Sequence, residues 1–338
     1  MKAVGYLKSL PIGEPDSLID ITLEKPQPGG RDLRVAVRAV SVNPIDTKVR
    51  MRAAPGVGEP AKVLGYDAAG VVDAAGPEVT LFKTGDEVFY AGSIVRPGTN
   101  AEFHLVGRAH VGRKPKSLSF AQAAALPLTG ITAWEILFDR FAVAPGKTPD
   151  GRALLVIGGA GGVGSIMIQL ARRLTALTVI ATASRPESAA WCQKLGADHI
   201  IDHSKPMAAQ LKAIGHGNVA LIAGLTGTEQ HYPAIQEIIA PQGKFALIDD
   251  PKSLDAVPLR RKAVSIHWES MFTRSIFTTP DMIAQHRLLN EISAMVDGGL
   301  MIATSAMELS PINAANLKRA HAQVESGTTI GKVVLHGW

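Results

Sequence analysis

A glycine-rich segment in the middle of the chain has the spacing of a phosphate-binding turn. Gly159, Gly161 and Gly164 satisfy the pattern G-x-G-x-x-G. In such a turn the first glycine permits a tight bend, the second lets pyrophosphate oxygens approach bare backbone, and the third lets the following helix pack closely. The amides at the start of that helix then meet the negative phosphates. We predict dinucleotide binding, with a plain packing turn as the alternative. The predicted contacts in the turn are Gly159, Gly161, Gly162, Val163 and Gly164.

The residues after the next predicted strand, 178–182, indicate which nicotinamide cofactor fits. Sites for NAD usually carry an acidic residue there, which binds the ribose hydroxyls. Here Ser184 and Arg185 follow the strand, while the nearest acid, Glu187, comes after a proline and begins the next predicted helix. A guanidinium and a hydroxyl can both bind a 2′-phosphate. We therefore predict NADPH, with Ser184 and Arg185 as contacts; a solvated loop arginine is the alternative.

These motifs require a strand before the turn and a helix after it, and the surrounding pattern predicts both. An apolar run over 153–157 precedes the turn and an amphipathic pattern over 162–174 follows it. Strand-like and helical runs then continue to alternate, which predicts a parallel sheet covered on both faces. The amino-terminal part instead has short strand-like runs separated by glycine and proline, which indicates a β-rich domain.

Composition excludes several classes of function. The 338 residues carry 35 basic and 30 acidic side chains, a net charge of +5 without long basic runs, and only 5% aromatic residues. These values are typical of a solvated surface rather than of a nucleic-acid groove. The single cysteine, Cys192, excludes an intrachain disulfide framework and any multi-cysteine zinc site. Because no apolar run reaches membrane-spanning length, we expect a cytoplasmic protein with no membrane partner.

Five segments together resemble one protein family. They are residues 41–50, 64–72, 82–89 and 123–134 and the glycine turn, and they resemble the medium-chain dehydrogenase/reductase superfamily, in particular its zinc-free quinone oxidoreductase branch among the alcohol dehydrogenase-like proteins. The resemblance spans nearly the whole chain. It implies an α/β protein with a GroES-like β-rich catalytic domain and a Rossmann domain with a doubly wound parallel sheet. The implied borders are 1–125 for the catalytic domain, 126–278 for the NADPH-binding Rossmann domain, and 279–338 for a carboxyl segment that returns to the catalytic domain.

The departure from the zinc enzymes of this superfamily concerns two positions. Zinc members carry a cysteine where Asn43 stands and a histidine where Tyr66 stands. An amide and a phenol cannot supply the thiolate and imidazole that catalytic zinc requires, so we predict no metal. Without a Lewis acid, hydride delivery from NADPH to quinones or α,β-unsaturated carbonyls is the less demanding chemistry. The alternatives are a reductase or dehydrogenase of simple carbonyls or alcohols, and a non-catalytic NADPH-binding protein.

The resemblance also implies roles for single residues. In an enone the carbonyl oxygen gathers negative charge, and Lys48 or Tyr66 could donate to it. Asn43 is expected to orient nicotinamide, substrate or water, and Asp46 to hold Lys48 or the cofactor amide. The alternatives are a surface lysine, a space-filling tyrosine, a loop-stabilising aspartate, and water as the proton source. By resemblance, Thr129 and His203 join the cofactor contacts, with a strand-end surface histidine as the alternative for His203, and the partner is a second copy of the chain in a homodimer.

Overall fold

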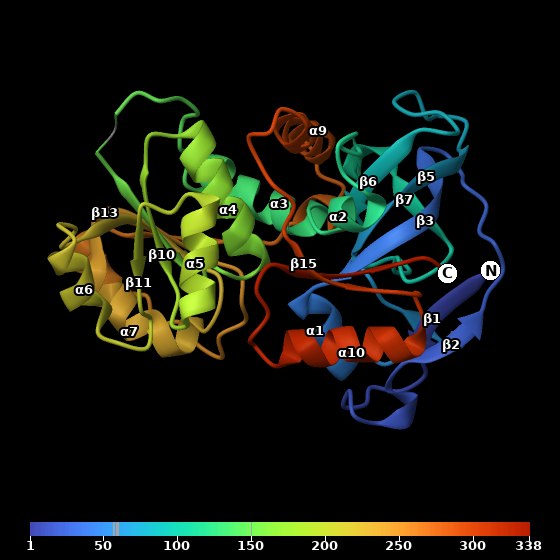
Figure 1. Ribbon diagram of the computed structural model, residues 1–338, viewed down its shortest axis with the longest axis horizontal. Coiled ribbons are helices and arrows are strands. Elements are labelled where there is room, and N and C mark those ends of the chain that lie inside the picture. The colour runs from blue at the N-terminus through green and yellow to red at the C-terminus, as the bar shows by residue number, and fades with distance from the viewer. Residues whose placement is uncertain (57, 59–60, 150) are drawn as a thin grey trace. The chain divides into compact units, whose positions relative to one another are not determined.

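The computed structural model describes residues 1–56, 58, 61–149 and 151–338, and it divides into two compact units (Figure 1). One unit combines Met1–Ile131 with Phe272–Trp338, and the other is Thr132–Met271. The predicted fold class, a GroES-like sheet domain plus a Rossmann-type parallel sheet, is confirmed. The unit borders fall at 131/132 and 271/272, whereas the sequence placed them at 125/126 and 278/279. The first border falls inside one continuous helix, α3 (Pro127–Trp134), where composition gives no signal.

The unit Thr132–Met271 contains a six-stranded parallel sheet in the order β11-β10-β9-β12-β13-β14. Strand β9 is apolar and buried along its whole length, as expected for a central strand with both faces covered. Their bounds are β9 Ala153–Ile157, β10 Thr178–Thr182, β11 His199–Ile201, β12 Val219–Gly224, β13 Ile239–Leu247 and β14 Ser265–Trp268.

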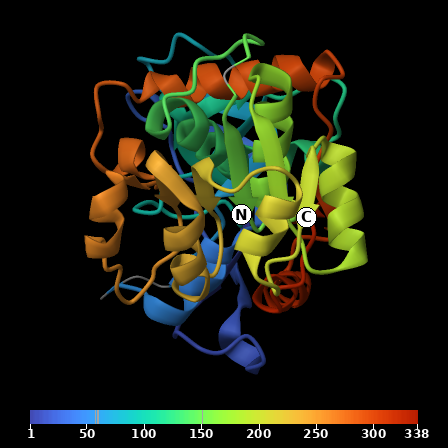
Figure 2. The same cartoon turned by 90° about the vertical axis from the view of Figure 1, so that its left-hand side faces the viewer.

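Helices cover both faces of this sheet (Figures 1 and 2). Helix α4 packs beside α5, and α6 packs beside α7. The helical run over 162–174 was predicted with the bounds of α4, and the helix predicted to begin near Glu187 is α5; α7 accommodates Pro233 inside it. The helices are α4 Gly162–Leu174, α5 Pro186–Leu195, α6 Met207–Ala213 and α7 Thr228–Ile238, with a π-helix, η3 Glu135–Arg140, and a 3₁₀ helix, η4 Val257–Lys262.

The other unit is built on a seven-stranded sheet in the order β15-β16-β3-β5-β6-β8, with β7 also paired to β3. A second, three-stranded sheet of this unit has the order β2-β1-β4. The carboxyl-terminal β16 pairs antiparallel with β3, so Val333 lies opposite Val42. The strands are β1 Lys2–Tyr6, β2 Ile19–Thr22, β3 Asp32–Val42, β4 Lys62–Val63, β5 Asp67–Ala75, β6 Glu87–Ala91, β7 Phe103–Gly107, β8 Val111–Arg113, β15 Ser305–Leu309 and β16 Lys332–His336.

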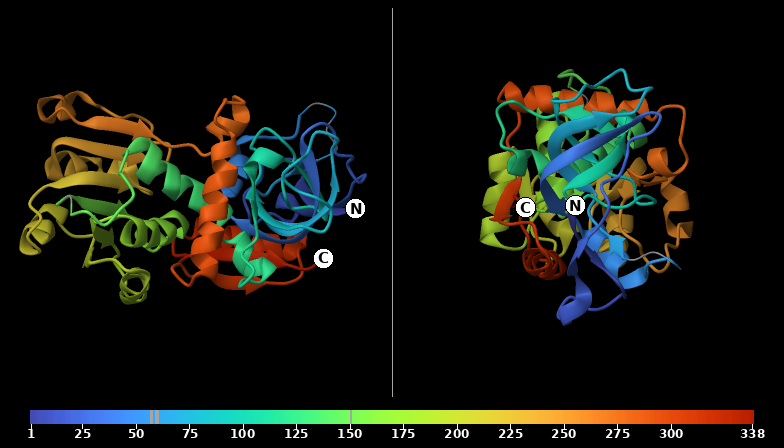
Figure 3. Two further views of the ribbon diagram at one scale, coloured as in Figure 1. Left: turned by 90° about the horizontal axis from the view of Figure 1, so that it is seen from above. Right: turned by 90° about the vertical axis from the view of Figure 1, so that its right-hand side faces the viewer.

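Helices close this unit at its margins. Helix α10 packs against α1, and the long α9 lies along β8 (Figures 1 and 3). No helix of the described residues is both long enough and apolar enough to cross a membrane. The helices are α1 Pro44–Arg52, α2 Phe120–Ala124, α8 Thr273–Ile276, α9 Ile283–Asp297 and α10 Ala314–Glu325, with 3₁₀ turns η1 Pro15–Ser17 and η2 Arg108–His110.

Candidate functional site

The glycine turn connects β9 to α4 as predicted, and two glycines shape its entry. Gly158 adopts φ +87°, a left-handed conformation that favours glycine. A Cβ on Gly159 would lie 2.8 Å from the Cβ of Ala181 and 3.1 Å from the Sγ of Cys192. The tight bend therefore belongs to Gly158, while Gly159 is required because β10 and α5 leave no room for a side chain.

The third glycine of the motif brings α4 against the turn. A Cβ on Gly164 would lie 2.5 Å from the carbonyl oxygen of Gly158 and 2.6 Å from that of Gly159. A Cβ on Gly161 would meet only the Gly158 carbonyl, at 3.4 Å, so this glycine faces open space. Helix α4 begins at Gly162 with Gly161 as its N-cap, and its first amides have no partner inside the helix. This backbone cradle fits a pyrophosphate.

The tip of β10 carries the two residues predicted to read the ribose. Ser184 is exposed, and the Arg185 side chain is 38% exposed with its Nη1 3.6 Å from Glu187 Oε1. Glu187 thus contacts the arginine across the start of α5, where the sequence placed it only as the first acid of that helix. The pair is loose and solvated, so a phosphate could compete for the guanidinium.

His203 lies after β11 and reaches the same strand tip. Its Nδ1 is 3.1 Å from Thr182 Oγ1, and its ring meets the ring of His231 edge-on, with 5.6 Å between centroids. His231, in α7, is buried, and burial followed by the charge of His203 lowers its pKa. Sequence analysis did not single out His231, because a histidine inside a helical pattern gives no sign of a partner 28 residues earlier.

In the β-rich unit, Asn43 is the N-cap of α1 and Asp46 lies in its first turn. The Asp46 carboxylate accepts the backbone N–H of Asn43 at 2.7 Å and that of Gly65 at 3.0 Å. Burial raises the pKa of Asp46 to about 7, against these two hydrogen bonds and the charge of Lys332. One oxygen of Asp46 therefore closes a capping box at the start of α1, and the other ties α1 to the turn before β5.

Asn43 belongs to a buried polar group that the sequence did not predict. We call Ser41, Asn43, Asp67 and Lys332 the Asp67 cluster. Asp67 Oδ2 accepts Ser41 Oγ and Asn43 Nδ2, each at 2.7 Å, and lies 3.2 Å from Lys332 Nζ. Lys332 Nζ also donates to Asn43 Oδ1 and to the carbonyl of Val42. The Asp67 side chain is fully buried and that of Lys332 is 3% exposed, so burial lowers the pKa of Lys332 while the Asp67 charge opposes the shift.

Tyr66 and Lys48, the two predicted donors, lie in different surroundings. Tyr66 is 2% exposed, and its ring meets Phe272 edge-on with 5.3 Å between centroids. Burial raises the pKa of Tyr66, and the charge of Asp46 raises it further, so the phenol keeps its proton. Lys48 is half-buried on α1. Their roles as donors stay predictions.

Thr129 lies in the first turn of α3, and the Asp67 cluster contacts this turn. Its hydroxyl is buried and lies 3.2 Å from the carbonyl of Leu126. The preceding residue, Leu128, donates its backbone N–H to Asp67 Oδ1 at 2.7 Å. The predicted cofactor contact therefore lies on a turn that is fixed from the β-sheet.

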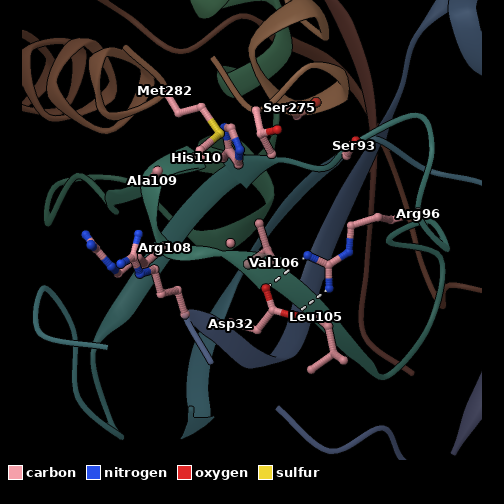
Figure 4. Close-up of a pocket in the computed structure, with 13 residues that line it drawn as sticks. Asp32, Ser93, Arg96, Leu105, Val106, Arg108, Ala109, His110, Ser275 and Met282 are labelled. Atoms are coloured by element: carbon pink, nitrogen blue, oxygen red, sulfur yellow. Dashed lines mark hydrogen bonds and ion pairs between the residues drawn. The ribbon is translucent and has the colours of Figure 1, made fainter. Parts of the chain in front are cut away.

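A separate hollow of about 340 Å³ opens in the same unit and contains none of the predicted site residues. Arg96 and Asp32 form a two-bond ion pair on its wall, at 2.9 and 2.8 Å (Figure 4). Ser93 Oγ and Arg108 Nε are buried there without a hydrogen-bond partner among the described residues. The remaining wall is largely apolar, with Leu105, Val106 and Met282.

The residues present do not fit a zinc site. In the described ranges no group of three or more His, Cys, Asp and Glu side chains could hold a metal ion. Asn43 and Asp67 are already bonded to the ammonium group of Lys332. An amide and a single carboxylate lack the thiolate and imidazole set that zinc prefers.

Two protein-family models match the chain. A model described as alcohol dehydrogenase GroES-like domain matches residues 29–132, and one described as zinc-binding dehydrogenase matches residues 195–335. A zinc-type alcohol dehydrogenase-like protein of Staphylococcus aureus is 40% identical over 99% of this chain and 100% of its own length. A quinone oxidoreductase of Pseudomonas aeruginosa is 28% identical over 96% of both chains.

Solved structures give the same answer for the fold. A Rhizobium etli protein named as a zinc-dependent alcohol dehydrogenase is 60% identical, with a TM-score of 0.96 over 100% of this chain and 98% of that one. A mycobacterial protein crystallised with NADPH is 27% identical, with a TM-score of 0.83 over 99% of this chain and 100% of that one.

Proposed function

This chain belongs to the medium-chain dehydrogenase/reductase superfamily of oxidoreductases, and we propose that it is an NADPH-dependent, zinc-independent enzyme. Its substrates would be quinones or α,β-unsaturated carbonyls. The single observation that carries the proposal is the Asp67 cluster, in which an ammonium group is bonded to Asn43, at the position where the resemblance places a zinc-binding cysteine. An acceptor that is already electron-poor does not require the Lewis acid that this donor set lacks.

NADPH, when bound, supplies the hydride, and the parallel-sheet unit would hold it. The first amides of α4 would bind the pyrophosphate, with Gly159, Gly161, Gly162, Val163 and Gly164 leaving the backbone bare. Arg185, Ser184 and His203 would bind the 2′-phosphate, since a guanidinium, a hydroxyl and an imidazole can all donate to it. In the β-rich unit, Asn43 and Thr129 would position the nicotinamide end.

Charge on the acceptor's carbonyl oxygen would be met by Lys48, whose ammonium group can donate a hydrogen bond or a proton. Tyr66 is the second candidate, and its raised pKa suits a donor that remains protonated at neutral pH. Lys48→Met and Tyr66→Phe separate the two candidates, because only removal of the true donor should lower kcat while NADPH binding is unchanged. Wild-type kcat in both variants would favour water as the proton source.

The names of relatives favour a second candidate, a zinc-dependent alcohol dehydrogenase. The deciding experiment follows NADPH absorbance with quinones, enones, simple ketones and aldehydes, and NADP⁺ reduction with alcohols, each with and without chelator. Chelator-resistant reduction of quinones or enones supports the proposal. Chelator-sensitive alcohol oxidation would replace it, and NADPH binding without turnover of any acceptor would indicate a non-catalytic protein.

We also expect a homodimer formed along β14. This strand ends the parallel sheet, and an uncovered edge with an apolar side chain invites pairing. Trp268, at the end of β14, is 56% exposed. Light scattering should give twice the mass of 35.7 kDa, and Trp268→Glu should shift the protein toward the monomer. A wild-type monomer at micromolar concentration would refute this expectation.

A further inference from the structure

Lys332 completes the Asp67 cluster, and each N–H of its ammonium group has a hydrogen-bond acceptor. Its ammonium group has three N–H donors and three acceptors: the carbonyl of Val42, the amide oxygen of Asn43 and the carboxylate of Asp67. The Asp67 carboxylate in turn accepts Ser41 Oγ, Asn43 Nδ2, Lys332 Nζ and the Leu128 N–H. Each charge is buried, and each is compensated by the other.

The arrangement fixes the Asn43 side chain in one orientation. Its amide oxygen accepts from Lys332 and its amide nitrogen donates to Asp67 at 2.7 Å, so rotating the amide by 180° would oppose like groups on both sides. The same carboxylate holds the backbone of Leu128, the residue before Thr129. One ion pair therefore orients two residues that the proposed function places at the nicotinamide.

Strand pairing brings these groups together from distant parts of the chain. Ser41 lies opposite Asp67 where β3 pairs with β5, and Val333 lies opposite Val42 where β16 pairs with β3. Lys332, the first residue of β16, thereby reaches the end of β3, 289 residues from Asn43. A buried ion pair is weak evidence for stability, because apolar side chains of similar size often serve as well. Its presence here calls for a role beyond packing.

We propose that Lys332 is a positioning residue and the resident cation of this site: its ammonium group neutralises Asp67 and orients the Asn43 amide and the first turn of α3. This inference rests on the proposed NADPH-dependent function for its kinetic consequence. Its structural part, an internal ammonium group that compensates Asp67, stands without that function.

The main test removes both charges together. Lys332→Met alone leaves Asp67 buried without a partner and could unfold the protein, so the informative variant is Lys332→Met/Asp67→Asn. We expect this double variant to melt close to the wild type and to bind NADPH with similar affinity, while kcat falls at least about tenfold, because misplaced groups at the reacting centre are costly. A purely structural pair would change the melting temperature and leave kcat as it is.

The matched control uses the same two strands. Arg34 of β3 and Asp73 of β5 form a cross-strand ion pair, with Nε and Oδ2 2.6 Å apart, at the other end of the β3–β5 ladder from Ser41 and Asp67. Arg34→Met/Asp73→Asn should keep the wild-type kcat. Wild-type kcat in the Lys332→Met/Asp67→Asn variant, or equal kcat losses in the two double variants, would overturn the positioning role.

Zinc content tests the structural part independently of turnover. Wild-type protein dialysed against zinc and then desalted should carry well under one zinc per chain. One zinc per chain that disappears in Asp67→Asn would overturn the assignment of Lys332 as the resident cation. If the wild type reduces no acceptor, the proposed function fails, and this measurement still decides whether the lysine holds the site.

Discussion

The glycine turn and the Asp67 cluster both hold polar groups in fixed places, but they do so by opposite means. The turn lies within seven consecutive residues and works because side chains are absent, as the 2.5 Å approach of a Gly164 Cβ to the Gly158 carbonyl shows. The cluster joins Lys332 to partners 265 and 289 residues away and works because opposite charges are buried together. The first arrangement is local and steric, and the second is non-local and electrostatic. Substitutions should therefore act alone in the turn and in coupled pairs in the cluster.

The largest expected effect breaks the turn. Gly164→Ala places a methyl group against two carbonyl oxygens and should lower the free energy of unfolding by about 2–3 kcal/mol, with a parallel loss of NADPH binding. Gly161→Ala is the control, since its Cβ meets one carbonyl at 3.4 Å; it should weaken NADPH binding with little loss of stability. Urea unfolding and NADPH titration measure both. Equal destabilisation by the two variants would show that the packing of α4 on the turn is not what requires Gly164.

The next largest expected effect concerns a buried ion pair in the parallel-sheet unit. Glu269 is fully buried and pairs with Arg140 at 2.7 Å, and burial, followed by the nearby Glu135, raises the pKa of Glu269 from 4.5 to about 9. A carboxyl group whose folded pKa lies above its unfolded value contributes most stability below about pH 4.5, and that contribution is lost as the pH rises toward 9.

Glu269→Gln should remove this dependence. Relative to the wild type, the variant should gain about 2 kcal/mol of stability between about pH 5 and about pH 9. Urea unfolding across that range measures the gain, and Glu187→Gln, an exposed carboxylate of the same unit, is the control with no expected change of slope. Parallel pH profiles for Glu269→Gln and the wild type would contradict the raised pKa.

A smaller effect is expected at the rim of the proposed cofactor site, where the side chains are neither tightly packed nor part of a buried ion pair. Arg185→Ala should lower kcat/KM for NADPH roughly tenfold and leave NADH nearly unchanged, since a solvated charge-assisted hydrogen bond is worth about 1.5 kcal/mol. Glu187→Ala removes the competing carboxylate 3.6 Å away and should improve NADPH slightly. Equal losses with both cofactors in Arg185→Ala would show that the arginine does not read the phosphate.

Sequence reasoning succeeded where the physical cause is local. The bounds of α4 and α5 follow from a glycine N-terminus, a proline start and apolar periodicity, and the turn between β9 and α4 follows from three glycines. It was less successful where the cause is distant. The role of Asp46 in holding Lys48 or the cofactor amide stays a prediction, while its hydrogen bond to the backbone of Gly65, 19 residues away, was not predicted. Lys332 was not among the predicted site residues.

The sequence by itself determined the two kinds of sheet, the turn that can hold a dinucleotide, and side chains at Asn43 and Tyr66 that supply neither a thiolate nor an imidazole. Each of these depends on residue type, short-range sterics or periodicity, which are present in any stretch of a few residues. Tertiary structure alone decided that Lys332 neutralises Asp67, that Asp67 reaches Leu128, and that His203 meets His231. Those contacts depend on how strands and helices pack and on charge compensation in a buried environment, and neither exists until residues 28 to 265 positions apart are brought together by the fold.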